Sequence, residues 1–478
     1  MQPALSTTFR LLPGRRRLFG TEVRSDTSPR VLLLTSGLGF GHVRAAQAVE
    51  AALLQRSASV RMLDLWSLMN PGAASIVHQT YLRLVQEYPD LYERLYQLDE
   101  HTWRQILESE EGPPAAVLEV LELISQIAAS TVAEAKGAQY ASDRLLLSML
   151  YTSLPYDRTS LAGNGVRARL AIMKWSWLRL SKRLESIVEA YAPDVIVSTQ
   201  MIPAAMISAL KLRGRLHVPL MGVLTDYGLH DFWRQPGVDH YCIAHESVAT
   251  AAPRSHSTAG VTATGVPLMP AFAQPVSQLE ARRQLNLEPS GRIVLILGGG
   301  LGLSVDAIAA QLLERPSSTS LIVMPGKNAN ARSALSLRVA NNSRMTPAQS
   351  GKRGRIQVCE WTERMDIFIR AADVVVGKPG GVSVAEVLAC GRPLFATRSL
   401  GGQEGFNVRF LERHAVGALV PNGELANCIE TILARPEALA DMQQRAWTLG
   451  CRTGAARISE LALDLAWTHR PQAATREH

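Results

Sequence analysis

A glycine-rich loop that ends in a histidine is the first stretch of this chain with the residues for chemistry. Residues 37–42 read Gly-Leu-Gly-Phe-Gly-His, between a short apolar run and a helical pattern. Glycines let a backbone lie close to a ligand, and the helix behind them points its positive end at that space. We expect His42, at the helix start, to stay neutral, the form that accepts a proton. A helix-start histidine with only a structural hydrogen bond explains the same residues equally well.

A dinucleotide site is a rival interpretation of this loop, because Asp64 ends the next predicted strand and would suit a ribose. In the dinucleotide fingerprint the third glycine follows the second by three positions. Here Gly41 follows Gly39 by two positions. The spacing therefore argues against a nicotinamide or flavin cofactor.

A second glycine-rich turn spans residues 298–302, between a predicted strand and a helix. The backbone N–H groups of Gly300, Leu301 and Gly302 suit a phosphate or diphosphate, and a plain strand-to-helix turn is the alternative. Two such loops at matching places in two halves are a stronger signal than one. The pair Gly326-Lys327 lacks the glycine spacing and the following Ser/Thr of a Walker sequence, which argues against an ATPase.

A third glycine turn, Gly380-Gly381, follows an apolar run and precedes another helix. Ser383 and Glu386 have the spacing of a capping box, which would explain both residues structurally. The functional interpretation is that this helix start meets a nucleotide and that Glu386 accepts two ribose hydroxyls. A carboxylate suits a vicinal diol because each of its oxygens accepts a hydrogen bond.

Two further polar groups stand where ligands bind in parallel α/β folds. Gln403, Glu404 and Asn407 follow a Gly-Gly turn and are the kind of cluster that binds sugar hydroxyls, with a solvated helix start as the alternative. Asp226 ends a predicted strand, so its carboxylate faces the crevice at the carboxyl ends of the strands. It could act as a base or orient one, or cap a turn.

Short apolar runs predict the strands that position these loops. Each half of the chain opens with strand, glycine loop and helix, the first unit of a doubly wound parallel sheet. We therefore predict an α/β chain with two Rossmann-like domains that face a central cleft. The predicted strands are residues 31–34, 60–63, 195–198, 220–224, 241–244, 293–297, 321–324, 356–358 and 374–376, with a last strand from Leu394.

The order of these elements predicts four parts. Residues 1–29 form a basic tail that we expect to be disordered. Residues 30–258 form an N-terminal domain for the acceptor, and residues 259–455 form a C-terminal domain for the nucleotide. Residues 456–478 form a helix and tail, and this helix could pack back on the N-terminal domain.

The composition narrows the class of protein. The chain has 478 residues, 47% of them hydrophobic, and a formal net charge of +8. The excess of positive charge fits an anionic membrane surface or a phosphate-bearing substrate, and no nucleic-acid module is recognisable. The five cysteines form no Cys-x-x-Cys pair, so we expect neither a disulfide framework nor a zinc site. No run is long enough to span a bilayer, so any membrane contact is expected to be peripheral.

Together the motifs resemble glycosyltransferase family 28, whose members have the two-domain GT-B fold. The likeness is closest to the diacylglycerol sugar transferases, which are bacterial processive diacylglycerol glucosyltransferases and plant monogalactosyldiacylglycerol synthases. Any one motif is weak, but their number and order over most of the chain support the resemblance. The matching segments are residues 39–43, 193–199, 224–230 with Trp233, 265–267, 298–302, 378–381 and 402–407.

The resemblance implies a role for each candidate residue. His42 and Asp226 would lie by the acceptor hydroxyl as base and helper. The residues assigned to substrate binding are Gly39 and Gly41 in the first loop, Gly300, Leu301 and Gly302 at the diphosphate, Trp361 and Thr362 beside the uracil, Gly380, Gly381 and Ser383 near phosphate, Glu386 at the ribose, and Gln403, Glu404 and Asn407 at the sugar.

The resemblance also implies a reaction. A hexose would pass with inversion from UDP-glucose, which is favoured, or UDP-galactose to diacylglycerol or a glycosyl-diacylglycerol. No cofactor and no metal would be required, and the enzyme would be cytoplasmic and peripheral at the inner face of the membrane. The alternatives are a UDP-sugar 2-epimerase-like isomerase, transfer to another lipid acceptor, and a non-catalytic UDP-sugar-binding protein.

Two features limit what the resemblance implies about the acceptor. Phe40 stands where plant members carry a glycine, and residues 108–170 match no family segment. Residues 172–184 combine Trp175 and Trp177 with lysines and arginines, the composition of an interfacial helix. An amphipathic helix packed on the first domain is the alternative.

Overall fold

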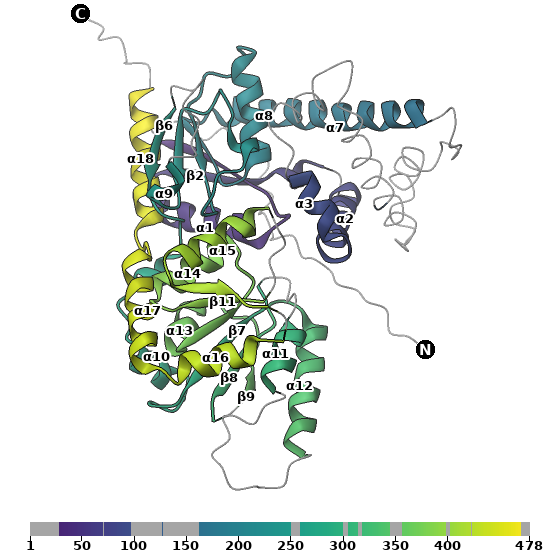
Figure 1. The fold of residues 1–478 in the computed structure, drawn as a ribbon. Coiled ribbons are helices and arrows are strands. Elements are labelled where there is room, and N and C mark those ends of the chain that lie inside the picture. The colour runs from purple at the N-terminus through teal and green to yellow at the C-terminus, as the bar shows by residue number, and fades with distance from the viewer. Residues whose placement is uncertain are drawn as a thin grey trace, which may run out of the picture.

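Two parallel sheets of six strands each form the framework of the protein (Figure 1). This computed structural model describes residues 28–69, 71–96, 127, 162–249, 259–299, 305–313, 318–344, 356–397, 402–421 and 423–469. Helices flank both sheets, so the predicted fold class, two Rossmann-like domains, is confirmed.

The N-terminal sheet is built around short apolar runs that are buried on both faces, with more exposed strands at its two edges. Its strands are β1 (Arg30–Thr35), β2 (Ser59–Asp64), β3 (Val195–Ser198), β4 (Leu220–Val223), β5 (His240–Ile243) and β6 (Gly260–Ala263). They pair in parallel in the order β2-β1-β3-β4-β5-β6. Val31 of β1 lies between Val60 and Val195, so β-branched side chains pack across the centre of the sheet.

The C-terminal sheet repeats this design. Its strands are β7 (Ile293–Leu297), β8 (Ser320–Met324), β9 (Ile356–Val358), β10 (Val374–Gly377), β11 (Leu394–Ala396) and β12 (Gly417–Leu419). Their parallel order is β12-β11-β10-β7-β8-β9. In each sheet the chain reverses direction beside the first strand, and ligands bind at such a switch point. Across the two domains, helix α1 (Phe40–Leu54), which follows β1, packs against helix α14 (Gly381–Ala389), which follows β10.

Helices connect the strands and cover both sheets. Those of the N-terminal half are α1 (Phe40–Leu54), α2 (Pro71–Glu87), α3 (Pro89–Tyr96), α7 (Ala162–Tyr191), α8 (Met201–Leu212) and α9 (Glu246–Ala249). Those of the C-terminal half are α10 (Gln278–Gln284), α11 (Val305–Leu313), α12 (Ala329–Arg344), α13 (Met365–Ala371), α14 (Gly381–Ala389), α15 (Gln403–Arg413), α16 (Leu425–Leu433), α17 (Pro436–Leu449) and α18 (Gly454–Thr468). Within the described ranges, 3₁₀ turns lie at Leu65–Leu68, Asp231–Trp233 and Pro270–Ala273.

The last helix crosses from the second domain to the first. Helix α17 packs against α14 of the C-terminal domain, whereas α18 packs against α1 and runs beside the first sheet (Figure 1). Ile458, Ala462 and Ala466 of α18 are fully buried in one cluster with Val31 and Leu33 of β1. The two domains are therefore joined at two places, by the chain before α10 and by the α17–α18 junction.

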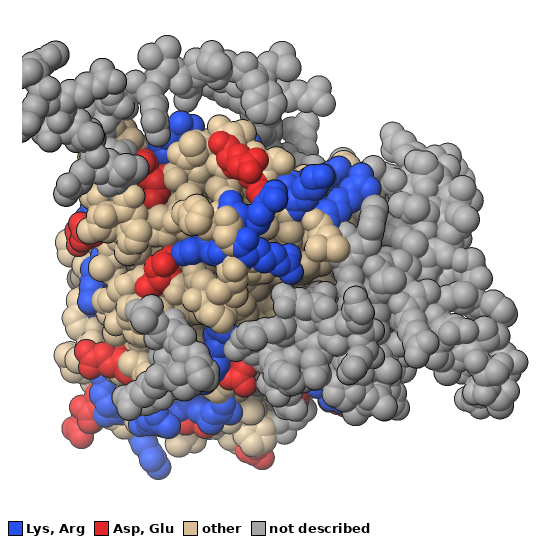
Figure 2. Space-filling model, turned by 90° about the horizontal axis from the view of Figure 1, so that it is seen from above, with Lys and Arg blue, Asp and Glu red and all other residues tan. Residues whose placement is uncertain are grey.

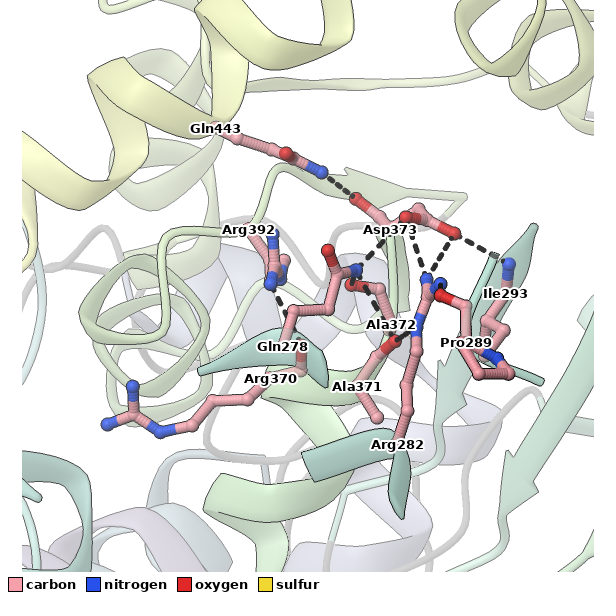
Figure 3. A network of polar contacts seen from close by, with 10 residues as sticks. All are labelled: Gln278, Arg282, Pro289, Ile293, Arg370, Ala371, Ala372, Asp373, Arg392 and Gln443. Carbon is pink, nitrogen blue, oxygen red and sulfur yellow. Dashed lines mark hydrogen bonds and ion pairs between the residues drawn. The ribbon is translucent and has the colours of Figure 1, made fainter. Parts of the chain in front are cut away.

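A buried polar network fixes the amino end of the C-terminal sheet (Figure 3). The Arg282 guanidinium donates to both carboxylate oxygens of Asp373 at 3.0 Å, and the backbone N–H of Ile293 donates to the same carboxylate at 2.7 Å. Gln278 also donates to Asp373 at 3.0 Å. Asp373 precedes β10 and Lys378 follows it, about 16 Å further along the strand direction. The network is structural and lies at the end of the sheet opposite the cleft.

The edges of the sheets differ from the predicted elements. Strands β6 and β12 have no long apolar run, so the sequence did not predict them. Strand β6 pairs with β5, so the first sheet extends to Ala263, past the predicted domain boundary between residues 258 and 259. That part of the boundary was wrong, because a short edge strand carries no strong pattern.

Candidate active site between the two domains

The His42 ring has a defined tautomer. It lies in the first turn of α1, and its Nδ1 is 2.9 Å from the carbonyl oxygen of Thr199, which follows β3. A carbonyl oxygen only accepts hydrogen bonds, so Nδ1 must carry the hydrogen. The Thr199 hydroxyl in turn donates to the His42 carbonyl at 3.0 Å. Nε2 is therefore the basic nitrogen of the neutral ring.

The electrostatic surroundings keep this ring neutral. Burial lowers the pKa of His42 below its ordinary value of 6.5, and the negative charge of Asp226 and the Thr199 hydrogen bond only partly oppose it. At neutral pH the ring can therefore accept a proton, as the sequence predicted. The hydrogen bond that orients the ring comes from Thr199, while Asp226 acts on it through its charge.

The first glycine loop is held by Asp64. One carboxylate oxygen accepts from the backbone N–H of Gly37 at 3.2 Å and from that of Trp66 at 3.0 Å. A Cβ on Gly37 would stand 2.5 Å from the other oxygen, so only glycine fits against this carboxylate. Asp64 is thus a structural brace for the loop, and the dinucleotide interpretation loses the acid it would need.

The loop after β4 inserts into the C-terminal domain. A Cβ on Gly381 would lie 1.9 Å from the carbonyl oxygen of Thr225 and 2.6 Å from a carboxylate oxygen of Asp226. A Cβ on Gly228 would lie 2.2 Å from the ring of Phe406. Both glycines are required by this close approach, one on each side of the domain interface. Gly41 similarly lies against Val382 of α14.

Asn407 ties the two domains together across this contact. Its amide nitrogen donates to Asp226 at 2.9 Å and to the Pro379 carbonyl at 3.0 Å, and its oxygen accepts from the Tyr227 backbone N–H at 2.8 Å. The side chain is fully buried. The sequence predicted that Asn407 is near the site, but not that two of its partners, Asp226 and Tyr227, belong to the other domain.

A charged pair and two tyrosines surround the predicted sugar cluster. Lys378, after β10, pairs with buried Glu404 at 2.6 Å. The Tyr92 hydroxyl lies 3.5 Å from the side-chain oxygen of Gln403. Burial raises the pKa of the Tyr81 phenol, which Lys378 acts to lower and Glu404 to raise, so Tyr81 lies near this pair. Neither Lys378 nor the two tyrosines were predicted from the sequence as site residues.

The capping-box interpretation of Ser383 and Glu386 was wrong. Helix α14 begins at Gly381, with Gly380 as its N-cap and no side-chain cap. Both side chains therefore lie within the helix. Burial raises the pKa of Glu386 to about 7, the positive charge of Arg44 opposes this rise, and Asp366 adds to it. Arg44 belongs to α1, so Glu386 lies near the first domain.

Aromatic and charged side chains close the outer side of the interface. The rings of Phe40 and Trp361 lie 6.4 Å apart, and the Lys327 ammonium is 4.9 Å from each ring centroid. Arg44 and Glu363 form an ion pair at 3.0 Å. Phe40, the residue that departs from the glycine of plant relatives, therefore contacts the second domain beside Trp361.

Of the remaining predicted residues, one supports a turn and three lie outside the described residues. The Thr362 hydroxyl accepts from the backbone N–H of Arg364 at 3.0 Å, so it supports the turn before α13. Gly300, Leu301 and Gly302 lie outside the described residues. Their neighbour Gly299 has a φ of 61°, a left-handed conformation that suits glycine. Among the residues described, no group of three or more His, Cys, Asp or Glu could hold a metal ion.

Comparison with known proteins connects this site to glycolipid synthesis. A family model described as monogalactosyldiacylglycerol (MGDG) synthase matches residues 162–268. A processive diacylglycerol β-glucosyltransferase of Bacillus subtilis is 27% identical over 269 residues, covering 55% of this chain and 67% of the relative. One from Bacillus cereus is 22% identical over 417 residues and covers 86% of each chain.

The solved structures add support for the fold alone. The crystal structure of MurG from Acinetobacter baumannii matches with a TM-score of 0.54 and 16% identity, covering 91% of this chain and 99% of that one. The resemblance to the diacylglycerol sugar transferases is thus confirmed by relatives, and the two-domain fold by structure. The chain is a glycolipid-synthesising glycosyltransferase.

The tautomer of His42 can be tested directly by NMR of protein labelled with ¹⁵N-histidine. At pH 7 we expect the neutral form with the hydrogen on Nδ1, because that nitrogen donates to the Thr199 carbonyl. The ring should take up its second proton only below pH 6.5, because burial lowers its pKa. His42→Gln identifies the signal by its loss. A ring protonated on Nε2, or a pKa above 7, would contradict this geometry.

Proposed function

We propose that this glycosyltransferase moves a hexose from a UDP-sugar to diacylglycerol or a glycosyl-diacylglycerol, with inversion, at a membrane surface. The observation that carries the proposal is the basic Nε2 of the buried, neutral His42 ring, which lies near the contact between the two domains and feels the negative charge of Asp226. The names of the relatives supply the acceptor, and UDP-glucose is favoured over UDP-galactose because both relatives named above are glucosyltransferases.

The reaction we propose is a single displacement. The acceptor hydroxyl attacks C1 of the sugar while the bond from C1 to the diphosphate breaks, and His42 takes the hydroxyl proton on Nε2. An α-linked donor then gives a β-linked product and UDP. A general base of this kind contributes about 10²–10⁴-fold in rate. Asp226 stabilises the imidazolium that forms, because its charge raises the pKa of His42.

Residues of the C-terminal domain would bind the donor. In this proposal Glu386 accepts the ribose hydroxyls, Trp361 and Thr362 flank the uracil, and Gln403 and Glu404 hold the sugar. Helix α14 begins with glycines and has no side-chain cap, so the backbone N–H groups of its first turn are open to a ligand. In this proposal they stabilise, together with Ser383, the charge that grows on the leaving diphosphate. We propose that this stabilisation makes a divalent ion unnecessary.

Basic residues on α7 and α8 support action at an anionic surface. Leu180 and Leu184 of α7 are buried in the first domain, so this half of the helix packs as an amphipathic helix. Its other face and the end of α8 expose Arg179, Lys182, Arg183, Arg213 and Arg215. Figure 2 shows Lys and Arg side chains gathered on the face seen from above, where α7 and α8 lie in Figure 1.

Two exposed leucines lie among these charges. Leu178 is 55% exposed on α7 and Leu212 is 63% exposed at the end of α8. Apolar side chains among basic ones are typical of a surface that binds anionic lipid. The side chains of 162–175, including Trp175, lie outside the described ones. No helix within the described residues is long and apolar enough to cross a bilayer.

The reaction is tested by incubating the purified protein with diacylglycerol liposomes and either UDP-glucose or UDP-galactose, with products read by mass. We expect a hexosyl-diacylglycerol, and a ladder of hexoses if the product is used again as an acceptor. His42→Ala should lower turnover by about 10²–10⁴-fold and leave UDP binding nearly intact. Product from His42→Ala at the wild-type rate would remove the proposed base, and no product from either donor would contradict the proposed acceptor.

The proposed role of Glu386 predicts that donor binding depends on pH. Its pKa is raised to about 7, and only the ionised carboxylate accepts both ribose hydroxyls. Affinity for UDP-glucose should therefore approach its maximum at about pH 8 and fall by about tenfold between pH 8 and pH 6. Glu386→Gln should bind more weakly and lose this pH dependence, whereas the exposed Glu430→Gln should match wild type in calorimetry. A wild-type affinity that is the same at both pH values would contradict the assignment.

The membrane surface is tested by flotation with anionic vesicles at low salt. Lys182→Glu combined with Arg213→Glu should reduce binding, because each reversal replaces attraction by repulsion at an exposed position. Arg338→Glu combined with Arg435→Glu, at exposed sites of the C-terminal domain, is the matched control and should bind like wild type. Equal loss in both pairs would indicate a general charge effect and no defined surface.

A further inference from the structure

We propose that Asn407 is a positioning residue that couples the donor-sugar end of α15 to Asp226 in the other domain. This inference rests on the proposed transfer reaction and gives Asn407 a role different from the sugar ligand expected from the sequence. Its contacts are unusual for a sugar ligand, because all of them are already made within the protein.

The hydrogen-bonding capacity of Asn407 is almost fully used. A carboxamide has two N–H donors, and here one reaches Asp226 and the other the Pro379 carbonyl. Its oxygen accepts from the backbone N–H of Tyr227. The side chain is 0% exposed. No N–H of Asn407 therefore remains for a sugar hydroxyl while the domains are in this arrangement.

The surrounding glycines show that this contact is built into both domains. Gly228 leaves room for Phe406, and Gly381 leaves room for the backbone of Thr225. Any Cβ at these positions would overlap its neighbour across the interface. The segment 225–228 thus fits a slot whose walls are α14 and α15, and Asn407 forms the polar end of that slot.

Helix geometry connects the slot to the sugar cluster. Asn407 follows Gln403 by four residues and Glu404 by three, so all three lie on one face of α15. Glu404 is 2% exposed and pairs with Lys378, the residue before Pro379. A shift of α15 when a sugar meets Gln403 and Glu404 must therefore move the partner of Asp226 as well.

The consequence is that donor and acceptor chemistry are linked. The Asp226 carboxylate raises the proton affinity of His42, so its position affects how well the ring takes a proton from the acceptor. The amide of Asn407 holds that carboxylate only when the two domains are closed on each other. Asp226 then reaches its working position when α15 is in place, which favours acceptor activation in the donor-bound state.

The test uses Asn407→Ala and Asn407→Asp in the full-length protein, with Asn427→Ala, an exposed asparagine on α16, as the matched control. In Asn407→Ala we expect kcat for hexose transfer to fall by about 10–100-fold, because the carboxylate loses its support. The Kd of UDP-glucose, measured by calorimetry, should be unchanged. A raised Kd with an unchanged kcat would overturn the proposal and make Asn407 a sugar ligand.

Asn407→Asp keeps the shape but places a second carboxylate beside Asp226. At pH 8 the two negative charges repel, so kcat relative to wild type should be low. Towards pH 6 one proton is shared between the pair, the donor to Asp226 returns, and the ratio to wild type should rise. A ratio that is the same at both pH values would contradict the role of the amide hydrogen.

Amide hydrogen exchange provides a readout that does not depend on activity. The Tyr227 N–H donates to Asn407, so its exchange should become at least about tenfold faster in Asn407→Ala and stay unchanged in Asn427→Ala. Unchanged protection of the Tyr227 N–H in Asn407→Ala would overturn the proposal. If the wild-type protein forms no hexosyl-diacylglycerol, the proposed reaction fails. The exchange measurement still decides whether Asn407 holds the 225–228 segment.

Discussion

The seating of one loop from the first domain in a slot of the second is the contact on which the rest of this site depends. Residues 225–228 follow strand β4 and enter a space that glycines at 228 and 381 keep open. Asn407 then binds the inserted loop through both Asp226 and Tyr227. A hydrogen bond to a charged group contributes about 1.5–3 kcal/mol, so this interaction weighs heavily in the interface. Through it, the group beside the base is positioned by the domain that we assign to the donor.

The direction of the His42 ring is fixed within the first domain. The His42 ring is oriented by the Thr199 carbonyl, so strands β1 and β3 fix its direction independently of domain closure. Burial keeps the ring neutral, and the charge of Asp226 supports the proton when it arrives. The first domain orients the His42 ring, and the second domain positions the charge of Asp226 through Asn407. Together they would give a base that works best when the two domains are closed on each other.

Much of this arrangement could be predicted from the sequence, because each strand and the loop behind it are encoded by a local pattern of residues. Runs such as Val195–Ser198 are apolar and end at polar residues, so the strands and the residues at their carboxyl ends can be predicted from the sequence. Contacts between residues far apart in the chain cannot be predicted in this way. The pairing of Ser383 with Glu386 suggested a capping box, whereas the structure uses Gly380 and Gly381 to start that helix because the Thr225 carbonyl approaches so closely. Lys378, Tyr81 and Tyr92 reach the cluster from elements that no periodicity connects, and the edge strands β6 and β12 lack an apolar signal.

In the proposed reaction the neutral imidazole of His42 takes the proton of the acceptor, and the pH dependence of kcat at saturating UDP-sugar is the sharpest test of this step. Under saturation kcat reports groups in the complex, so the titration of Glu386 in the free protein does not enter. Since the neutral ring is the active form and its pKa lies below 6.5, kcat should stay level near pH 7 and fall only below pH 6.5. In His42→Ala the residual rate should lose this acidic limb. An acidic limb that persists unchanged in His42→Ala would assign the proton transfer to another group and contradict the account.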